Sequence, residues 1–133
     1  AMAEANQRGW TTVGDTLTWL KLGIQASCER WGVPSAYAAS FAASATLGSN
    51  PMETIAMAKW TDMFLQGYEA WTEWRRLDFP VLSPPAAAIT GTGVPVRNGY
   101  GGLVPTQNKA SYEAAVAAQG PDNQDTKLWW DTK

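Results

Sequence analysis

The sequence predicts an all-α protein made of antiparallel helices, with a long irregular segment packed over them. Three observations predict this class. Apolar residues recur at steps of three and four through residues 15–77, short Gly- and Pro-containing breaks separate the helical stretches, and the periodicity stops at residues 78–108. We predict a single domain over 1–133, with a helical body at 1–77, an extended strap at 78–108, and a short helix with a Trp-containing tail at 109–133.

Three helices are predicted before residue 50. Residues 3 to about 12 form the first, with Gly14 as the break. Asp15 is placed to cap the second, which keeps helical spacing until Gly32. The third is alanine-rich and spans roughly residues 35–47, with Tyr37 and Phe41 on the same face as its alanines. The short connections imply antiparallel neighbours.

The central prediction is one long amphipathic helix over Pro51–Leu77. Asn50 can cap it, Pro51 fits its first turn, and Pro80 prevents its continuation. Its length of roughly 40 Å would allow several other helices to pack across it. The residues on its apolar side, expected in the core, are Met52, Ala56, Trp60, Met63, Phe64, Gly67, Trp71 and Trp74.

Residues after Asp78 change in character, with five prolines and five glycines up to Asn108. A segment this rich in both residues forms no long helix, so we predict an extended strap across the helices. A short helix then runs from Asn108 to about Gln119, and Gly120 ends it. Two adjacent tryptophans in the tail are costly to leave in water, so at least one is expected to pack on the body.

Composition excludes several classes of function. The net charge is −2, the pI is about 5.0 and no basic run occurs, which disfavours a nucleic-acid partner. Cys28 is the single cysteine, so no intrachain disulfide forms. The first residues run directly into helix-forming sequence, and we therefore expect a natural N-terminal portion to precede them. Faces that would meet that portion should be exposed, giving an apolar patch or self-association.

Catalytic and metal chemistry find little support. The chain has no histidine, which removes Ser-His and Cys-His nucleophiles and histidine metal sites. Glu69 and Glu73 stand four apart, a spacing compatible with the carboxylate pair of a glycosidase. Structural ion pairing is the better explanation, because Glu73 can pair with Arg76 at i,i+3 and Glu69 falls on the same side one turn earlier. We predict no catalytic residue, no metal and no cofactor.

Exposed aromatic rings are the remaining signal, because a flat ring can lie against the C–H face of a pyranose. Tyr100, Trp129 and Trp130 are predicted to lie in loops and are the candidates for carbohydrate contact.

Motifs along the chain resemble the C-terminal portion of the SusD/RagB family. The resemblance begins with Arg8-Gly9-Trp10 and continues through Lys59-Trp60. It is densest in Glu69-Ala70-Trp71-Thr72-Glu73-Trp74-Arg75-Arg76 and Phe79-Pro80, and extends to Val94-Pro95-Val96-Arg97, Tyr100 and Leu128-Trp129-Trp130-Asp131. It implies tetratricopeptide-like helix pairs in a surface-exposed outer-membrane lipoprotein whose lipid anchor lies outside this chain.

The family resemblance further implies non-enzymatic capture of glycans or other nutrients for a SusC-type TonB-dependent porin. The alternative is a structural module that docks another protein and binds no carbohydrate. The motif residues Trp60, Glu69, Trp71, Arg75, Arg76 and Arg97 are interpreted as scaffold. We expect Arg76 or Arg97 to tie the strap to the long helix, because a guanidinium can hold carbonyls and carboxylates at once.

Overall fold

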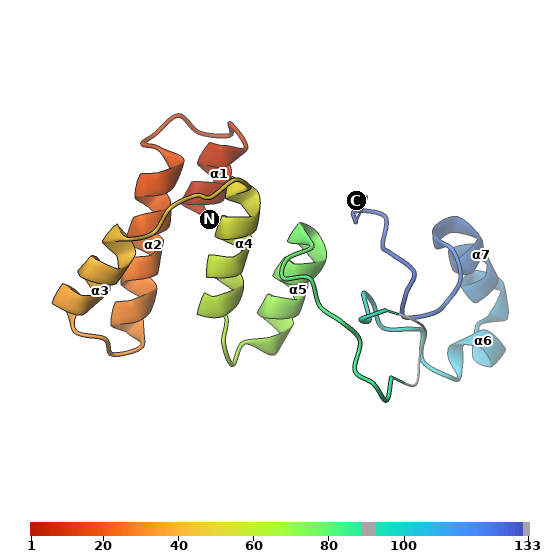
Figure 1. Cartoon of the computed structure of the whole chain (residues 1–133). Coiled ribbons are helices and arrows are strands. Elements are labelled where there is room, and N and C mark those ends of the chain that lie inside the picture. Colours follow the sequence, from red (N-terminus) through yellow and green to blue (C-terminus); the bar gives the residue numbers. More distant parts are fainter. Residues whose placement is uncertain (89–92, 132–133) are drawn as a thin grey trace. The chain divides into compact units, whose positions relative to one another are not determined.

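A computed structural model describes residues 1–88 and 93–131, and its regular elements within those ranges are all helical, as predicted. The chain forms two compact units, Ala1–Pro80 and Val81–Lys133 (Figure 1). Their boundary lies three residues beyond the predicted end of the helical body. Residues 89–92 of the predicted strap and 132–133 of the predicted tail lie outside the described residues. The packing of the strap over the helices as one domain stays a prediction.

Five helices make up the first unit, and their ends follow local sequence signals. The Asp15 carboxylate accepts a hydrogen bond from the Thr18 amide at 3.0 Å, and the Asn50 side chain accepts one from the Glu53 amide at 3.3 Å. Both predicted N-caps are therefore confirmed. The helices are α1 (Met2–Gln7), α2 (Thr16–Arg30), α3 (Ser35–Ala43), α4 (Pro51–Asp62) and α5 (Gly67–Leu77).

The core of the first unit lies where α1, α2 and α4 meet. Ala3, Leu20 and Ile55 form a buried cluster, and partly buried apolar side chains pack around it. In α3 the small residues Ala38 and Ala42 are buried, whereas Tyr37 and Phe41 are exposed. The expectation that the large and small residues of α3 share one buried face is wrong, because α3 packs closely on α2 through its alanines.

The predicted single helix over Pro51–Leu77 is also wrong. The chain forms two helices, α4 and α5, separated by a turn at residues 63–66, and they lie side by side (Figure 1). Leu65 in this turn has φ 68°, a left-handed conformation that a continuous helix does not contain. Helix α4 ends at Asp62, so Met63 and Phe64 belong to the turn and not to a helical stripe.

The second unit contains α6 (Val104–Gln107) and α7 (Lys109–Gln119). Helix α7 matches the predicted short helix to within one residue, and Gly120 ends it with φ 96°. The Val96 amide donates to the Gln124 carbonyl at 2.8 Å, which joins the segment before α6 to the segment after α7.

Candidate functional site

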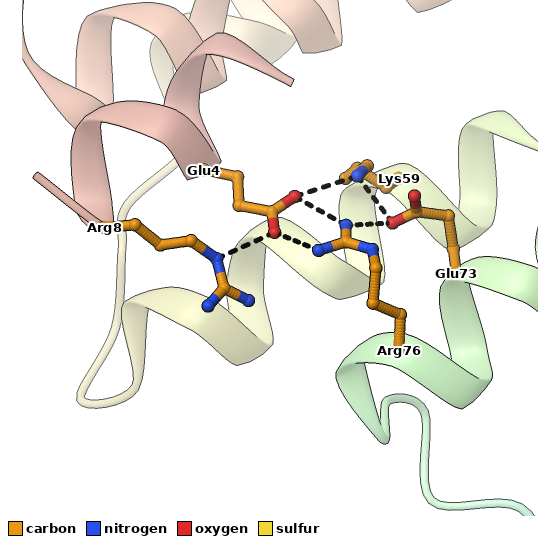
Figure 2. Close-up of polar contacts among 5 residues, drawn as sticks. All are labelled: Glu4, Arg8, Lys59, Glu73 and Arg76. Carbon is orange, nitrogen blue, oxygen red and sulfur yellow. Dashed lines mark hydrogen bonds and ion pairs between the residues drawn. The ribbon is translucent and has the colours of Figure 1, made fainter. Parts of the chain in front are cut away.

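A cluster of five charged residues joins three helices of the first unit (Figure 2). Glu4 of α1 is 4% exposed, and its carboxylate contacts Arg8 Nε at 3.0 Å, Lys59 Nζ at 3.0 Å and Arg76 Nη2 at 2.8 Å. Oε2 of Glu73 lies 2.5 Å from Lys59 Nζ and 2.7 Å from Arg76 Nη2. Because Lys59 is on α4 while Glu73 and Arg76 are on α5, the cluster fixes α1, α4 and α5 together.

The charges of this cluster keep both of its carboxylates ionised. Hydrogen bonds from Arg76, with others from Lys59 and Arg8, hold the pKa of Glu4 far below its ordinary value despite burial. Burial acts to raise the pKa of Glu73, but hydrogen bonds from Arg76 and Lys59 outweigh it and the pKa is lowered. The Glu4 carboxylate raises the pKa of Arg76. A lowered pKa is the opposite of what a general acid needs.

The predicted ion pairing is therefore found for Glu73 but not for Glu69. Glu69 is exposed, and no ion pair joins it to another residue that the structure describes. Glu4 was not among the predicted site residues, although the spacing of Glu4 and Arg8 at i and i+4 on one helix is a signal for such a pair. The long-range partners of Glu4 carry no such signal in the sequence.

Tryptophans of α4 and α5 are less buried than predicted. Trp60 is 36% exposed, which contradicts its expected place in the core. Trp71 is half-buried, with the Arg75 guanidinium carbon 3.8 Å from its ring centroid. Trp74 is half-buried and donates its Nε1–H to the Pro80 carbonyl at 2.9 Å. These contacts organise the end of α5, and the scaffold role of the motif residues stays a prediction.

In the second unit a buried arginine holds the loop that carries Tyr100. Arg97 is 5% exposed, and its guanidinium donates to the Asn98 carbonyl at 3.2 Å and to Asp122 Oδ1 at 3.2 Å. The Tyr100 amide donates to the same carboxylate, at 3.1 Å to Oδ1 and 3.3 Å to Oδ2. Asp122 therefore links the side chain of one loop residue to the backbone of another.

The Tyr100 side chain is positioned by further contacts within this unit. Its ring meets that of Tyr112 edge to face, with centroids 5.6 Å apart. The Gln119 amide, oriented with its oxygen toward Arg97, accepts from Arg97 Nη1 at 3.0 Å and from the Tyr100 hydroxyl at 3.2 Å. Desolvation and the nearby Asp122 charge raise the pKa of Tyr112. Tyr100 remains 40% exposed, so its ring is held and still accessible.

The described contacts of Arg76 and Arg97 do not join the strap to the helical body, as one of them was predicted to do. Arg76 contacts Glu4 and Glu73 in the first unit, and Arg97 contacts Asn98 and Asp122 in the second. A tie between the strap and the helices stays a prediction.

The tail presents one tryptophan to solvent. Trp129 is 86% exposed, whereas Trp130 is half-buried and makes contacts of its own. The packing of one of these tryptophans on the helical body stays a prediction. Tyr100 and Trp129 are thus the accessible members of the predicted carbohydrate-contact set, and Trp130 is the less accessible one.

Apolar side chains are exposed over much of the first unit. A groove of about 640 Å³ lies among α1, α2, α3 and α4, and its lining includes Met2, Leu22, Ile24 and Phe41. This matches the expected apolar exposure, while self-association stays a prediction. Within residues 1–88 and 93–131, no group of acidic or cysteine side chains is arranged to hold a metal, and no helix is long and apolar enough to span a bilayer.

This chain matches one family model and several solved structures of known proteins. A family model described as "Starch-binding associating with outer membrane" matches residues 1–101. A search of curated protein sequences gives no match. A solved structure titled a chitin-binding protein superimposes with a TM-score of 0.87 at 27% identity, covering 99% of this chain and 31% of that one.

Two further solved structures resemble this chain. One is a SusD-like protein of the Bacteroidetes, with a TM-score of 0.84 at 26% identity, covering 99% of this chain and 28% of that chain. The other is a chitin-binding SusD homologue from Flavobacterium johnsoniae, with a TM-score of 0.77 at 25% identity, covering 98% and 34%. The chain therefore spans about a third of the length of these structures.

Proposed function

Because this chain belongs to the SusD-like family, we propose that it serves in the non-enzymatic binding of glycans or other nutrients at the bacterial outer membrane. The observation that carries this proposal is the family match over residues 1–101, together with the helical superposition on proteins titled chitin-binding. We further propose that the chain is the C-terminal part of a longer surface lipoprotein, which works with a SusC-type TonB-dependent porin.

The described geometry favours binding over catalysis. The Glu4 and Glu73 carboxylates are held in ion pairs with lowered pKa values, so neither is suited to donate a proton to a leaving group. Exposed aromatic rings, by contrast, suit contact with sugars, and Tyr100 and Trp129 are 40% and 86% exposed. We propose Tyr100 and Trp129 as the principal glycan contacts of the second unit, with Trp130 as a secondary one.

The restraint of the Tyr100 loop and the exposure of Trp129 support this assignment. Arg97 and Asp122 restrain the backbone at Tyr100, which lowers the entropic cost of presenting its ring to a ligand. Trp129 offers the largest exposed aromatic surface of the tail. An indole face contributes apolar contact to the C–H side of a pyranose, and its N–H can reach a hydroxyl.

Titration of the protein with chitotriose and maltotriose tests the proposal, by calorimetry and by tryptophan fluorescence. We expect saturable binding of at least one of the two sugars, and a loss of affinity of tenfold or more at the second-unit site in Trp129→Ala. Trp10→Ala is the matched control, since Trp10 is 72% exposed but lies in the first unit and is not a proposed contact. Absence of saturable binding to either sugar would favour the alternative of a protein-docking module.

The porin partnership requires a separate test. Co-expression of the full-length protein with the TonB-dependent porin encoded beside it, followed by purification through a tag on the porin, should recover both. Recovery of the porin alone from detergent that keeps other porin complexes intact would contradict the partnership. Sequencing upstream for a lipoprotein cysteine tests the anchor.

A further inference from the structure

We propose that a cleft in the first unit, between the end of α2 and the turn after α4, binds a single pyranose unit of a glycan. The cleft is lined by Arg30, Trp31, Phe64, Leu65 and Gln66, and has a volume of about 270 Å³. It is distinct from Tyr100 and Trp129, which belong to the second unit. The assignment of a sugar as ligand rests on the proposed function.

One wall of the cleft is formed where α2 ends. The Trp31 amide donates to the Ser27 and Cys28 carbonyls, both at 3.1 Å, so its backbone still belongs to the last turn of the helix. Gly32 follows with φ 85°, a conformation that turns the chain away immediately. The Trp31 side chain is left 50% exposed at the helix end.

The opposite wall is the turn that separates α4 from α5. The Phe64 amide donates to the Thr61 carbonyl at 3.2 Å, and the Gln66 amide donates to the Met63 carbonyl at 2.8 Å, which closes a tight turn around Leu65. Leu65 has φ 68°, a left-handed conformation that is unfavourable for a residue with a Cβ. Strained residues of this kind are concentrated at functional sites.

Two aromatic rings from these walls meet in the cleft. The Trp31 and Phe64 centroids are 6.1 Å apart and their planes are inclined by 58°, so the rings form an open angle and not a closed stack. Phe64 is 66% exposed. Exposed apolar side chains that lie together can mark a ligand-binding groove. A pyranose matches an open pair of this kind, because its C–H faces are apolar and its edge is polar.

Polar groups lie beside the rings to receive the hydroxyls of a sugar. Arg30 Nη2 donates to the Asp62 carbonyl at 2.7 Å and to Asp62 Oδ1 at 2.6 Å, which fixes the end of α2 to the end of α4. A guanidinium has five N–H donors, and among the described residues only Nη2 of Arg30 is engaged in a hydrogen bond. Gln66 adds an exposed amide.

The size of the cleft limits the ligand. Pockets for small molecules usually measure about 300–1,000 Å³, and a volume of about 270 Å³ lies just below that range. The cleft therefore suits one ring of an oligosaccharide, with neighbouring units extending into solvent. The ligand combines a planar apolar face with several hydroxyls, whereas a purely aliphatic partner would leave the donors of Arg30 unused.

The number of sugar sites on the whole chain tests this inference. Calorimetric titration with chitotriose and with maltotriose is repeated on Trp31→Ala, Phe64→Ala and Trp129→Ala. We expect two sites on the unaltered protein, with only the second-unit site left in Trp31→Ala and Phe64→Ala, and only the cleft left in Trp129→Ala. Trp10→Ala is the control, because Arg8 lies 5.2 Å from the Trp10 ring much as Arg30 lies 5.6 Å from that of Trp31.

The outcomes separate this inference from the proposed function. If Trp129→Ala loses a site while Trp31→Ala and Phe64→Ala bind like the unaltered protein, the cleft assignment is wrong and glycan binding stands. If Trp31→Ala and Phe64→Ala each lose a site and Trp129→Ala does not, the cleft stands and the second-unit assignment is wrong. No binding to any form overturns both. Asp62→Asn keeps both rings, so its effect on binding does not arise from unfolding caused by the loss of a ring. It should weaken the cleft site by about threefold to tenfold.

Discussion

Lys59 and Glu73 are 14 residues apart in the sequence, yet Lys59 Nζ lies 2.5 Å from Glu73 Oε2. On a single straight helix the rise between them would be about 21 Å. The contact exists because the chain reverses at residues 63–66, which brings α5 back along α4. The same reversal places Arg76 against Glu4, so the turn creates both the charged cluster and one wall of the aromatic cleft.

Replacement of Leu65 tests the turn directly. Leu65 is 81% exposed and has φ 68°, so its side chain contributes little burial while its backbone is strained. Leu65→Asn should raise the free energy of unfolding by about 0.5–1 kcal/mol, because asparagine tolerates the left-handed region. Urea unfolding measures the change. In a continuous helix the same substitution would be destabilising, since asparagine is the weaker helix former, and that result would contradict the turn.

Neutralisation of Glu4 should destabilise the first unit. Glu4→Gln leaves Arg8, Lys59 and Arg76 without their shared counter-charge, and removing one partner of a buried ion pair costs about 3–5 kcal/mol. The Arg76 side chain is 32% exposed and therefore partly screened by water, so we expect a loss of about 2–4 kcal/mol.

The matched control for Glu4→Gln is Glu113→Gln. Glu113 pairs with Lys109 at 3.6 Å, with side chains 62% and 73% exposed. An exposed pair of this kind contributes about 0–1 kcal/mol. Equal effects of the two substitutions on the urea midpoint would show that the charged cluster does not hold the helices together.

Stability should fall as the solution becomes acidic. The pKa values of Glu4 and Glu73 lie below the ordinary value of 4.5, so their ionised forms stabilise the folded state. This stabilisation is complete above the ordinary pKa and is lost as the pH falls through the lowered values of the folded state. Urea midpoints measured from pH 7 down to pH 3 should decline below about pH 5. Glu4→Gln should decline less, and an identical profile would rule out Glu4 as a source of the dependence.

Removal of the Asp122 carboxylate should loosen the Tyr100 loop. Asp122→Ala leaves the Arg97 guanidinium buried without that acid and deprives the Tyr100 amide of its acceptor. We expect hydrogen exchange at the Tyr100 amide to accelerate at least tenfold, while amides within α2 keep their rates. Asp125→Ala is the control, since Asp125 is exposed and makes none of these contacts. Unchanged exchange at Tyr100 would show that the loop is held by other contacts.

The helical class and the helix starts after Asp15 and Asn50 could be predicted because they depend on local chemistry. The first and third helices end earlier, at Gln7 and Ala43, than the predicted residues 12 and 47. Asp15 and Asn50 cap helices through side chains that reach amides three residues away, and Gly32 and Gly120 end helices because they adopt positive φ without strain. Contacts between residues so close in sequence can be recognised from the local residue pattern. The same holds for Glu73 and Arg76, whose pairing follows from their spacing on one helix.

Long-range placement could not be predicted from the same patterns. Apolar residues continue through Met63 and Phe64 with helical spacing, so periodicity gives no sign of the break between α4 and α5. Nothing in the sequence marks Glu4 as the partner of Lys59 and Arg76, or Trp31 as the neighbour of Phe64. By itself, the sequence determined the helical class, the caps at Asp15 and Asn50, and the short helix that Gly120 ends. Only the tertiary structure decided where the chain reverses and which charges and rings meet, because those depend on residues tens of positions apart packing together.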